Sequence, residues 1–157
     1  MFYTILDDFI FYQQLTFKPI KYSNYELKLH RYFYNKTLID PSYTFIVKVE
    51  NMDFFFFFIN KKDYFQASMH LKSIRNEIKN KKISIIRADH VLIYLIFNFF
   101  PDLYIHDIRI VFNNQIGIYE ISIFFLKELN TYHIAVGRNG GYIKALNFFF
   151  EKHIIFE

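Results

Sequence analysis

Three of the four glycines in the chain lie together, at Gly137, Gly140 and Gly141, around Arg138 and Asn139. Glycine has no side chain and adopts positive φ readily, so this loop would let an anion approach the backbone closely. A helix that begins near Gly141 would point its free N–H groups and the positive end of its dipole at the same place. The spacing therefore predicts a site for a phosphate-like anion. The other interpretation of a short glycine motif is a turn between two core helices.

The histidines and carboxylates do not have the spacing of a catalytic or metal site. Metal sites favour histidines at i, i+4 or in short loops. The six histidines of this chain are instead scattered, at His30, His70, His90, His106, His133 and His153. Asp7 with Asp8, and Asp102 with Asp107, fit helix caps and turns at least as well as acid-base catalysis. No nucleotide-binding or nucleophile motif is present, so we expect neither an enzyme nor a bound metal or cofactor.

Residues 89–157 show the alternation and helical periodicity needed to position the glycine loop. In chain order they predict a helix over 89–100, strands over 105–112 and 118–126, a short helix over 130–136, the loop, a helix over 141–152 and a strand over 153–156. Asp89 is a suitable N-cap for the first helix, and Pro101 would end it because proline cannot continue the hydrogen-bond ladder. Ile143, Leu146 and Phe150 give the last helix one apolar face.

The residues before position 89 are less regular. Strands are predicted over 43–50 and 54–59, followed by an amphipathic helix over 61–82 that carries several lysines. Those lysines fit a solvated helix face, and contact with an RNA backbone is the alternative. The run of phenylalanines over 54–58 predicts a strand buried on both faces rather than a surface for base stacking. The arrangement of the first 60 residues is not predicted.

The composition indicates an AT-rich genome. Phe (22) and Tyr (13) are abundant while Gly (4) and Pro (3) are scarce, which follows the A and T content of their codons. The expected location is an organelle, a mitochondrion rather than a plastid. Because residues 1–10 carry no basic side chain, we expect the protein to be made there. The apolar runs over 52–59 and 91–100 are well short of the roughly 20 residues that span a bilayer, so no membrane partner is expected.

The stretch 134–146, IAVGRNGGYIKAL, resembles the signature of KH domains: an apolar residue, Gly-x-x-Gly, then Ile-x-x-Leu on the next helix. With a helix and two strands before it, the order is similar to the prokaryotic type (type II), whose loop clamps about four nucleotides of RNA backbone. The resemblance implies an α+β fold, with an aromatic-rich N-terminal extension over 1–85 and a KH-like RNA-binding domain over 86–157. The RNA-binding residues it implies are Gly137, Arg138, Asn139, Gly140, Gly141 and Lys144.

Within that type, residues 89–157 are similar to the KH region of the universal small-subunit ribosomal protein three. They depart from the family at Arg138 and Asn139, where it has two lysines, and over 130–133, where it has Arg-Pro-Gly. The resemblance implies a structural constituent of the mitochondrial small ribosomal subunit that binds rRNA, with the mRNA entry path as a further contact. Expected partners are neighbouring small-subunit proteins and a separate chain that supplies the family's missing C-terminal domain.

Two other functions remain open. The KH repeats of the transcription factor NusA match equally well locally, and residues 100–103 resemble the entry into their first strand. NusA, however, carries tandem KH modules and an S-type barrel, which this sequence does not display. The second alternative is an accessory subunit of an organellar respiratory membrane complex, in which the glycine loop is only a turn. Presence in small ribosomal particles or in respiratory complexes would separate these functions.

Overall fold

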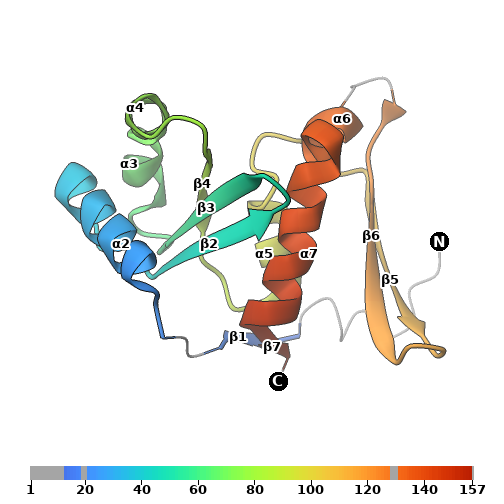
Figure 1. Ribbon diagram of the computed structural model, residues 1–157. Helices are drawn as coiled ribbons and strands as arrows, with labels where there is room; N and C mark the ends of the chain where they lie inside the picture. Colours follow the sequence, from blue (N-terminus) through green and yellow to red (C-terminus); the bar gives the residue numbers. More distant parts are fainter. Residues whose placement is uncertain (1–12, 19–20, 128–130, 157) are drawn as a thin grey trace.

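A three-stranded sheet forms the centre of the structure, a computed structural model that describes residues 13–18, 21–127 and 131–156 (Figure 1). Its strands are, in spatial order, β2 (Tyr43–Val49), β3 (Met52–Ile59) and β4 (Lys82–Arg87). β2 and β3 form an antiparallel hairpin, and β4 runs parallel to β3. The hairpin confirms the two strands predicted in this part of the chain. β4 begins where the sequence predicted the end of a helix.

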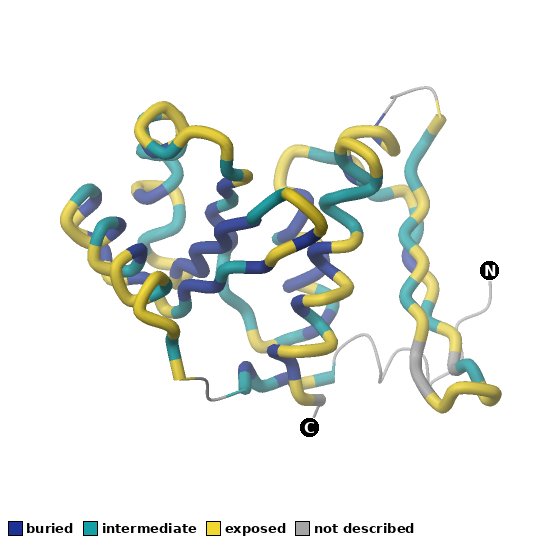
Figure 2. The backbone as a smooth tube through the Cα atoms, viewed as in Figure 1, coloured by how far each residue is buried: buried dark blue, intermediate teal, exposed yellow. Residues whose placement is uncertain are grey.

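The five phenylalanines of β3 are buried on alternate faces of the central sheet. Phe54, Phe56 and Phe58 belong to one hydrophobic cluster, and Phe55 and Phe57 belong to another. None of them is more than 5% exposed (Figure 2). A strand whose two faces are both covered needs no polar alternation. The predicted burial of this run on both faces is therefore confirmed.

One face of the central sheet is covered by α2 (Asn24–Thr37), α3 (Tyr64–Ser68) and α4 (Leu71–Glu77). The ring of Phe33 on α2 stacks on that of Phe57, with the ring centroids 4.5 Å apart. These three helices and the inward side chains of the sheet form a closed hydrophobic cluster. The first part of the chain therefore has a core of its own.

The start of α2 has a sequence signal that the prediction overlooked. Ser23 Oγ accepts the backbone N–H of Glu26, and the Glu26 carboxylate accepts the backbone N–H of Ser23. This reciprocal capping box satisfies two N–H groups that a helix start would otherwise leave unpaired. The other carboxylate oxygen of Glu26 accepts the backbone N–H of Ile46, 3.1 Å away, which ties the helix to β2.

The predicted helix over 61–82 is wrong in its length and in its end. α3 and α4 are separate helices with Met69 and His70 between them, and the chain then turns at Asn80, where φ is 65°. Phe65 and Met69 are 73% and 82% exposed, so the apolar periodicity did not mark a buried face. β4 follows with three buried isoleucines. A short apolar run of this kind has the same pattern in a buried strand as in a buried helix.

The other face of the central sheet is covered by α5 (Leu92–Asn98) and α7 (Gly141–His153). α7 packs along β2, and the ring of its Phe149 stacks on Phe58 with the centroids 5.0 Å apart. Both helices were predicted from their periodicity. Their principal contact is with β2, β3 and β4, in the half of the chain that the sequence assigned to an extension.

A second hairpin lies on the far side of α5 and α7 (Figure 1). It consists of β5 (Asp107–Asn113) and β6 (Ile118–Phe124), with Ile110 opposite Ile121. The predicted pairing of these strands is therefore confirmed. Its inward isoleucines pack against the same cluster as α5 and α7, so the two helices lie between the hairpin and the central sheet.

The remaining elements lead into the glycine loop and out of it. α6 (Thr131–Val136) is followed by a 3-10 turn, η2 (Arg138–Gly140), and α7 ends at β7 (Ile154–Phe156). β7 pairs antiparallel with β1 (Leu15–Phe17), which joins the first and last described strands. Among the described helices, none combines the length and the apolar character that crossing a membrane requires.

The described elements repeat one order twice: helix, strand, strand, helix, helix, strand. The first set is α2, β2, β3, α3, α4 and β4, and the second is α5, β5, β6, α6, α7 and β7. The sets differ in pairing, because β4 joins β3 whereas β7 joins β1. The fold is α+β, and its largest hydrophobic cluster takes side chains from both sides of residue 85.

Candidate nucleic-acid interface

The glycine loop joins α6 to α7 with a backbone that enters the left-handed region three times. Gly137, Asn139 and Gly140 have φ values of 82°, 55° and 69°. Glycine adopts this region freely, and asparagine is among the few other residues that tolerate it. The Gly137 N–H donates to the His133 carbonyl, and the Gly140 N–H donates to the Gly137 carbonyl, both at 3.1 Å. Residue types and local hydrogen bonds therefore fix the shape of the loop.

A side chain would clash at position 137 but not at position 140. A Cβ at Gly137 would lie 2.8 Å from Tyr142 Cβ and 2.9 Å from Tyr142 N, closer than side chains pack. At Gly140 the nearest atom would be Val136 Cγ1 at 3.9 Å, an ordinary contact. The backbone at Gly137 thus packs directly on the first turn of α7. The spacing of the glycines alone does not distinguish these two positions.

Tyr142 holds the first turn of α7 against the end of α5. Its hydroxyl donates to the Phe99 carbonyl over 2.5 Å, and its ring centroid lies 5.8 Å from that of Phe100. Burial raises the pKa of the Tyr142 phenol well above its usual value. The phenol therefore remains a hydrogen-bond donor at neutral pH, and the loop is followed by a firmly anchored residue.

Arg138 and Lys144, the two charged residues predicted at the site, have different surroundings. Lys144 Nζ lies 3.0 Å from a carboxylate oxygen of Glu50, in the turn between β2 and β3. Both side chains are exposed, and such a pair contributes at most about 1 kcal/mol. Arg138 is exposed and forms no hydrogen bond or ion pair with the part of the chain that the structure describes. The fixed charge of the loop is not neutralised.

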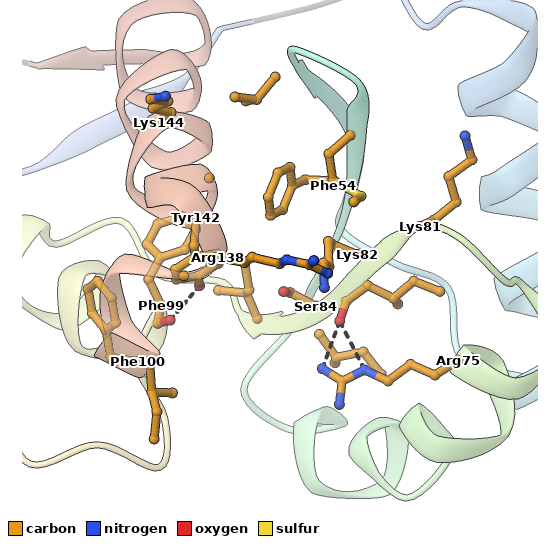
Figure 3. Close-up of a pocket in the computed structure, with 18 of the residues that line it drawn as sticks. Phe54, Arg75, Lys81, Lys82, Ser84, Phe99, Phe100, Arg138, Tyr142 and Lys144 are labelled. Atoms are coloured by element: carbon orange, nitrogen blue, oxygen red, sulfur yellow. Dashed lines mark hydrogen bonds between the residues drawn. The ribbon is translucent and has the colours of Figure 1, made fainter. Parts of the chain in front are cut away.

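A cleft of about 820 Å³ opens between the glycine loop and the start of β4 (Figure 3). Its basic residues are Arg75, Lys81, Lys82, Arg138 and Lys144, and its acidic residues are Glu50 and Asp102. Its apolar lining includes Phe54, Phe100, Tyr142 and Ile134. A concave site of this size that combines apolar walls with a few charged groups is typical of ligand-binding pockets.

Two further cations of the cleft are engaged by the protein. Lys81 Nζ pairs with Asp53 Oδ2 at 2.8 Å. The guanidinium of Arg75 donates from Nε and Nη2 to the Ile83 carbonyl, at 3.3 and 2.9 Å. A carbonyl satisfies hydrogen-bond donors but carries no net charge. Arg75 therefore keeps its full positive charge beside β4.

Lys82 is a further cation of the cleft without a counter-charge. It is the first residue of β4, is exposed, and forms no hydrogen bond or ion pair with any described residue. Figure 3 shows the side chain of Arg138 extending across the cleft towards Lys82. Two cations that face each other repel, whereas an anion between them is attracted to both. The arrangement is suited to a phosphate-like group.

Sequence reasoning missed the contribution of β4 and α4 to this site. It placed Arg75 on the polar side of one long helix and Lys81 and Lys82 at the end of that helix, with solvent as the simplest partner. The basic run over 79–82 was a visible signal. The position of β4, parallel to β3, is what brings the end of that run to the glycine loop.

No group of three or more His, Asp or Glu side chains in the described part of the chain is arranged to hold a metal ion. The cleft is lined by cations, glycine backbone, apolar side chains and the carboxylates Glu50 and Asp102.

No protein-family model matches the chain, and no curated protein matches it either. Among solved structures, the crystal structure of APE1850 is similar, with a TM-score of 0.58 and 20% sequence identity. The match covers 83% of this chain and 93% of that one. At this identity the likeness shows a shared fold that extends over nearly all of the other chain.

Proposed function

We propose that this chain binds single-stranded RNA, with residues 137–141 against the sugar-phosphate backbone in the manner of a KH domain. The observation that supports this most is the unneutralised Arg138, on a loop that Gly137 packs against the first turn of α7. The N–H groups at the start of a helix and the guanidinium fork both bind phosphate oxygens. The order of elements around the loop is consistent with a KH domain.

The proposed RNA is the rRNA of a mitochondrial small ribosomal subunit. The support is the resemblance of residues 89–157 to the KH region of small-subunit ribosomal protein three, together with the organelle-like composition. In that assembly the mRNA at the entry path is a second RNA contact.

A second candidate is an RNA-binding transcription factor of the NusA kind. The repeated order of elements favours it, because that factor contains tandem KH modules. The sequence alone showed no such repeat. Both candidates share the RNA-binding loop. They differ in the particle that holds the protein.

The first experiment tests the loop. Changing Arg138→Asp and Asn139→Asp together should weaken binding of a labelled single-stranded RNA of about 12 nucleotides by more than tenfold, because two carboxylates would face phosphate. Fluorescence anisotropy measures the Kd. Both side chains are exposed, so the melting temperature should stay unchanged. The control changes Lys61→Asp and Lys62→Asp, exposed residues beyond the other end of β3. Equal affinity of the loop variant and the wild type would contradict the proposal.

A second experiment identifies the particle. The tagged protein is sedimented from an organelle lysate with and without ribonuclease. Near-stoichiometric recovery with small ribosomal particles supports the first candidate, and recovery with transcription complexes supports the second. Recovery in detergent-solubilised membrane complexes, unaffected by ribonuclease, would contradict both.

A further inference from the structure

We infer that the cleft between the glycine loop and β4 belongs to the same RNA site, with one phosphate of the bound strand held between Arg138 and Lys82. This inference rests on the proposed binding of RNA by the loop. It extends the site from the loop to the first half of the chain, which the sequence assigned to an extension.

The register of the central sheet places Lys82 beside the loop. Lys82 lies opposite Phe54 on the neighbouring strand, and both side chains project from the face that α5 and α7 cover. A Cβ built on Gly141 would lie 3.4 Å from the ring of Phe54, so the start of α7 sits directly on that ring. Adjacent strands are about 4.8 Å apart. Lys82 therefore lies on the strand next to the residue on whose ring the start of α7 rests.

The charges of the cleft favour an anion between Arg138 and Lys82. Arg75 also lacks a counter-charge, but its guanidinium is held by the Ile83 carbonyl. Lys144 and Lys81 already have carboxylate partners, Glu50 and Asp53. Arg138 and Lys82 have none among the described residues. They come from different halves of the chain, and Figure 3 shows the first reaching towards the second. A phosphate between them would gain two charge-assisted contacts without breaking an existing ion pair.

The apolar part of the cleft favours a polynucleotide over a free phosphate. Ile134 on α6 is 66% exposed where it lines the cleft, and Leu103 lines it at partial exposure. A free phosphate would leave these apolar groups in water. A nucleotide places its base against them while its phosphate stays between the cations. The volume of about 820 Å³ is sufficient for such a unit.

The test compares Lys82 with a matched lysine outside the cleft. Lys82→Glu should weaken binding of a labelled single-stranded RNA of about 12 nucleotides by about tenfold, measured by fluorescence anisotropy. Lys82→Gln should lower the slope of log affinity against log salt by about 0.7, the value for one phosphate contact on a single strand. Lys61→Glu, which makes the same charge change at an exposed turn, should alter the affinity by less than about twofold. Melting curves check that each variant is folded.

A double-mutant cycle tests the shared phosphate. If Arg138→Gln and Lys82→Gln act on one phosphate, their combined loss should be smaller than the product of the two single losses. A combined loss equal to that product would overturn the shared contact. Cross-linking of a thiouridine-substituted RNA should label peptides from both 134–144 and 81–87, and labelling of the first peptide alone would also count against the inference.

The outcomes separate this inference from the proposed function. If the loop variant loses RNA binding while the Lys82 variants behave like Lys61→Glu, the inference fails and the loop function stands. If neither change affects binding, both fail. If an oligoglutamate of equal charge displaces the RNA as effectively as unlabelled RNA does, the cleft is a site for an acidic peptide and the inference is overturned.

Discussion

Gly137 and Lys82 show how single positions set the shape and the charge of the cleft. Gly137 brings the backbone against Tyr142, at a distance that leaves no room for a side chain. Lys82 is an ordinary exposed lysine. What distinguishes it is its position beside Phe54, whose ring contacts the start of α7. The first residue shapes the glycine loop from within. The second adds charge from another strand.

Gly137→Ala should lower the free energy of unfolding by more than the same change at a glycine in open space. Gly117, in the turn between β5 and β6, has a φ of 71°, close to the 82° of Gly137. A Cβ at Gly117 would meet nothing within 4 Å. Backbone strain alone should cost about 1–2 kcal/mol in Gly117→Ala, whereas Gly137→Ala adds a clash with Tyr142. Chemical denaturation measures both, and equal losses would show that the loop relaxes around the new methyl group.

α7 links the glycine loop to the core and to β7. Its first residue lies on Phe54, its middle buries Phe149 against Phe58, and its last residue, His153, stacks on Phe45 with the centroids 4.3 Å apart. One helix therefore sets the loop against the central sheet along its whole length. Because these contacts are apolar and close, the position of the loop depends on the packing of α7.

His153 should make stability depend on pH. Burial lowers its pKa from 6.5 to about 4, and its Nδ1 has no hydrogen-bond partner among the described residues. The unfolded chain takes up a proton at higher pH than the folded one, so stability should fall as the pH drops from about 6.5 towards 4. The loss attributable to this residue approaches about 3 kcal/mol.

Unfolding of wild type and His153→Phe at several pH values measures this effect. The variant keeps an aromatic ring at the site but cannot take up a proton, so its stability should decline less between pH about 6.5 and 4. Parallel curves for the two proteins would show that His153 does not titrate differently in the folded and unfolded states.

The whole molecule is layered as helices, central sheet, helices and hairpin (Figure 1). The central sheet and the second set of elements share one hydrophobic cluster, and the cleft lies where they meet. The first half of the chain is thus one wall of the interface and one side of the core. A net charge of +4 is modest, but the cleft gathers five of the basic residues.

A fragment of residues 86–157 should therefore not fold by itself. It lacks the phenylalanines of β3 that cover α7, and burial of each such side chain contributes about 1.5–3 kcal/mol. Thermal unfolding followed by circular dichroism should be cooperative for the full chain and not for the fragment. Co-expression with residues 1–85 should restore the transition. A fragment that melts cooperatively would show that residues 86–157 fold independently.

The sequence by itself determined most local structure in the second half of the chain. The alternation over 105–112 and 118–126, the periodicity over 141–152 and the glycine spacing are local patterns, and each produced the predicted element close to its observed limits. The burial of 54–58 on both faces followed from the length and apolar character of the run. The capping box at Ser23 is also visible in the sequence, as Ser-x-x-Glu over 23–26.

Only the tertiary structure decided where β4 lies and what the glycine loop faces. The short, mostly apolar run over 83–86 is compatible with either a helix or a buried strand. It forms a strand because it pairs with β3. That pairing places Lys82 beside Phe54, and α7 places Arg138 across from it. Local propensity carries no information about which distant segments meet. The cleft exists because the packing of α7 on the central sheet brings the two halves of the chain together.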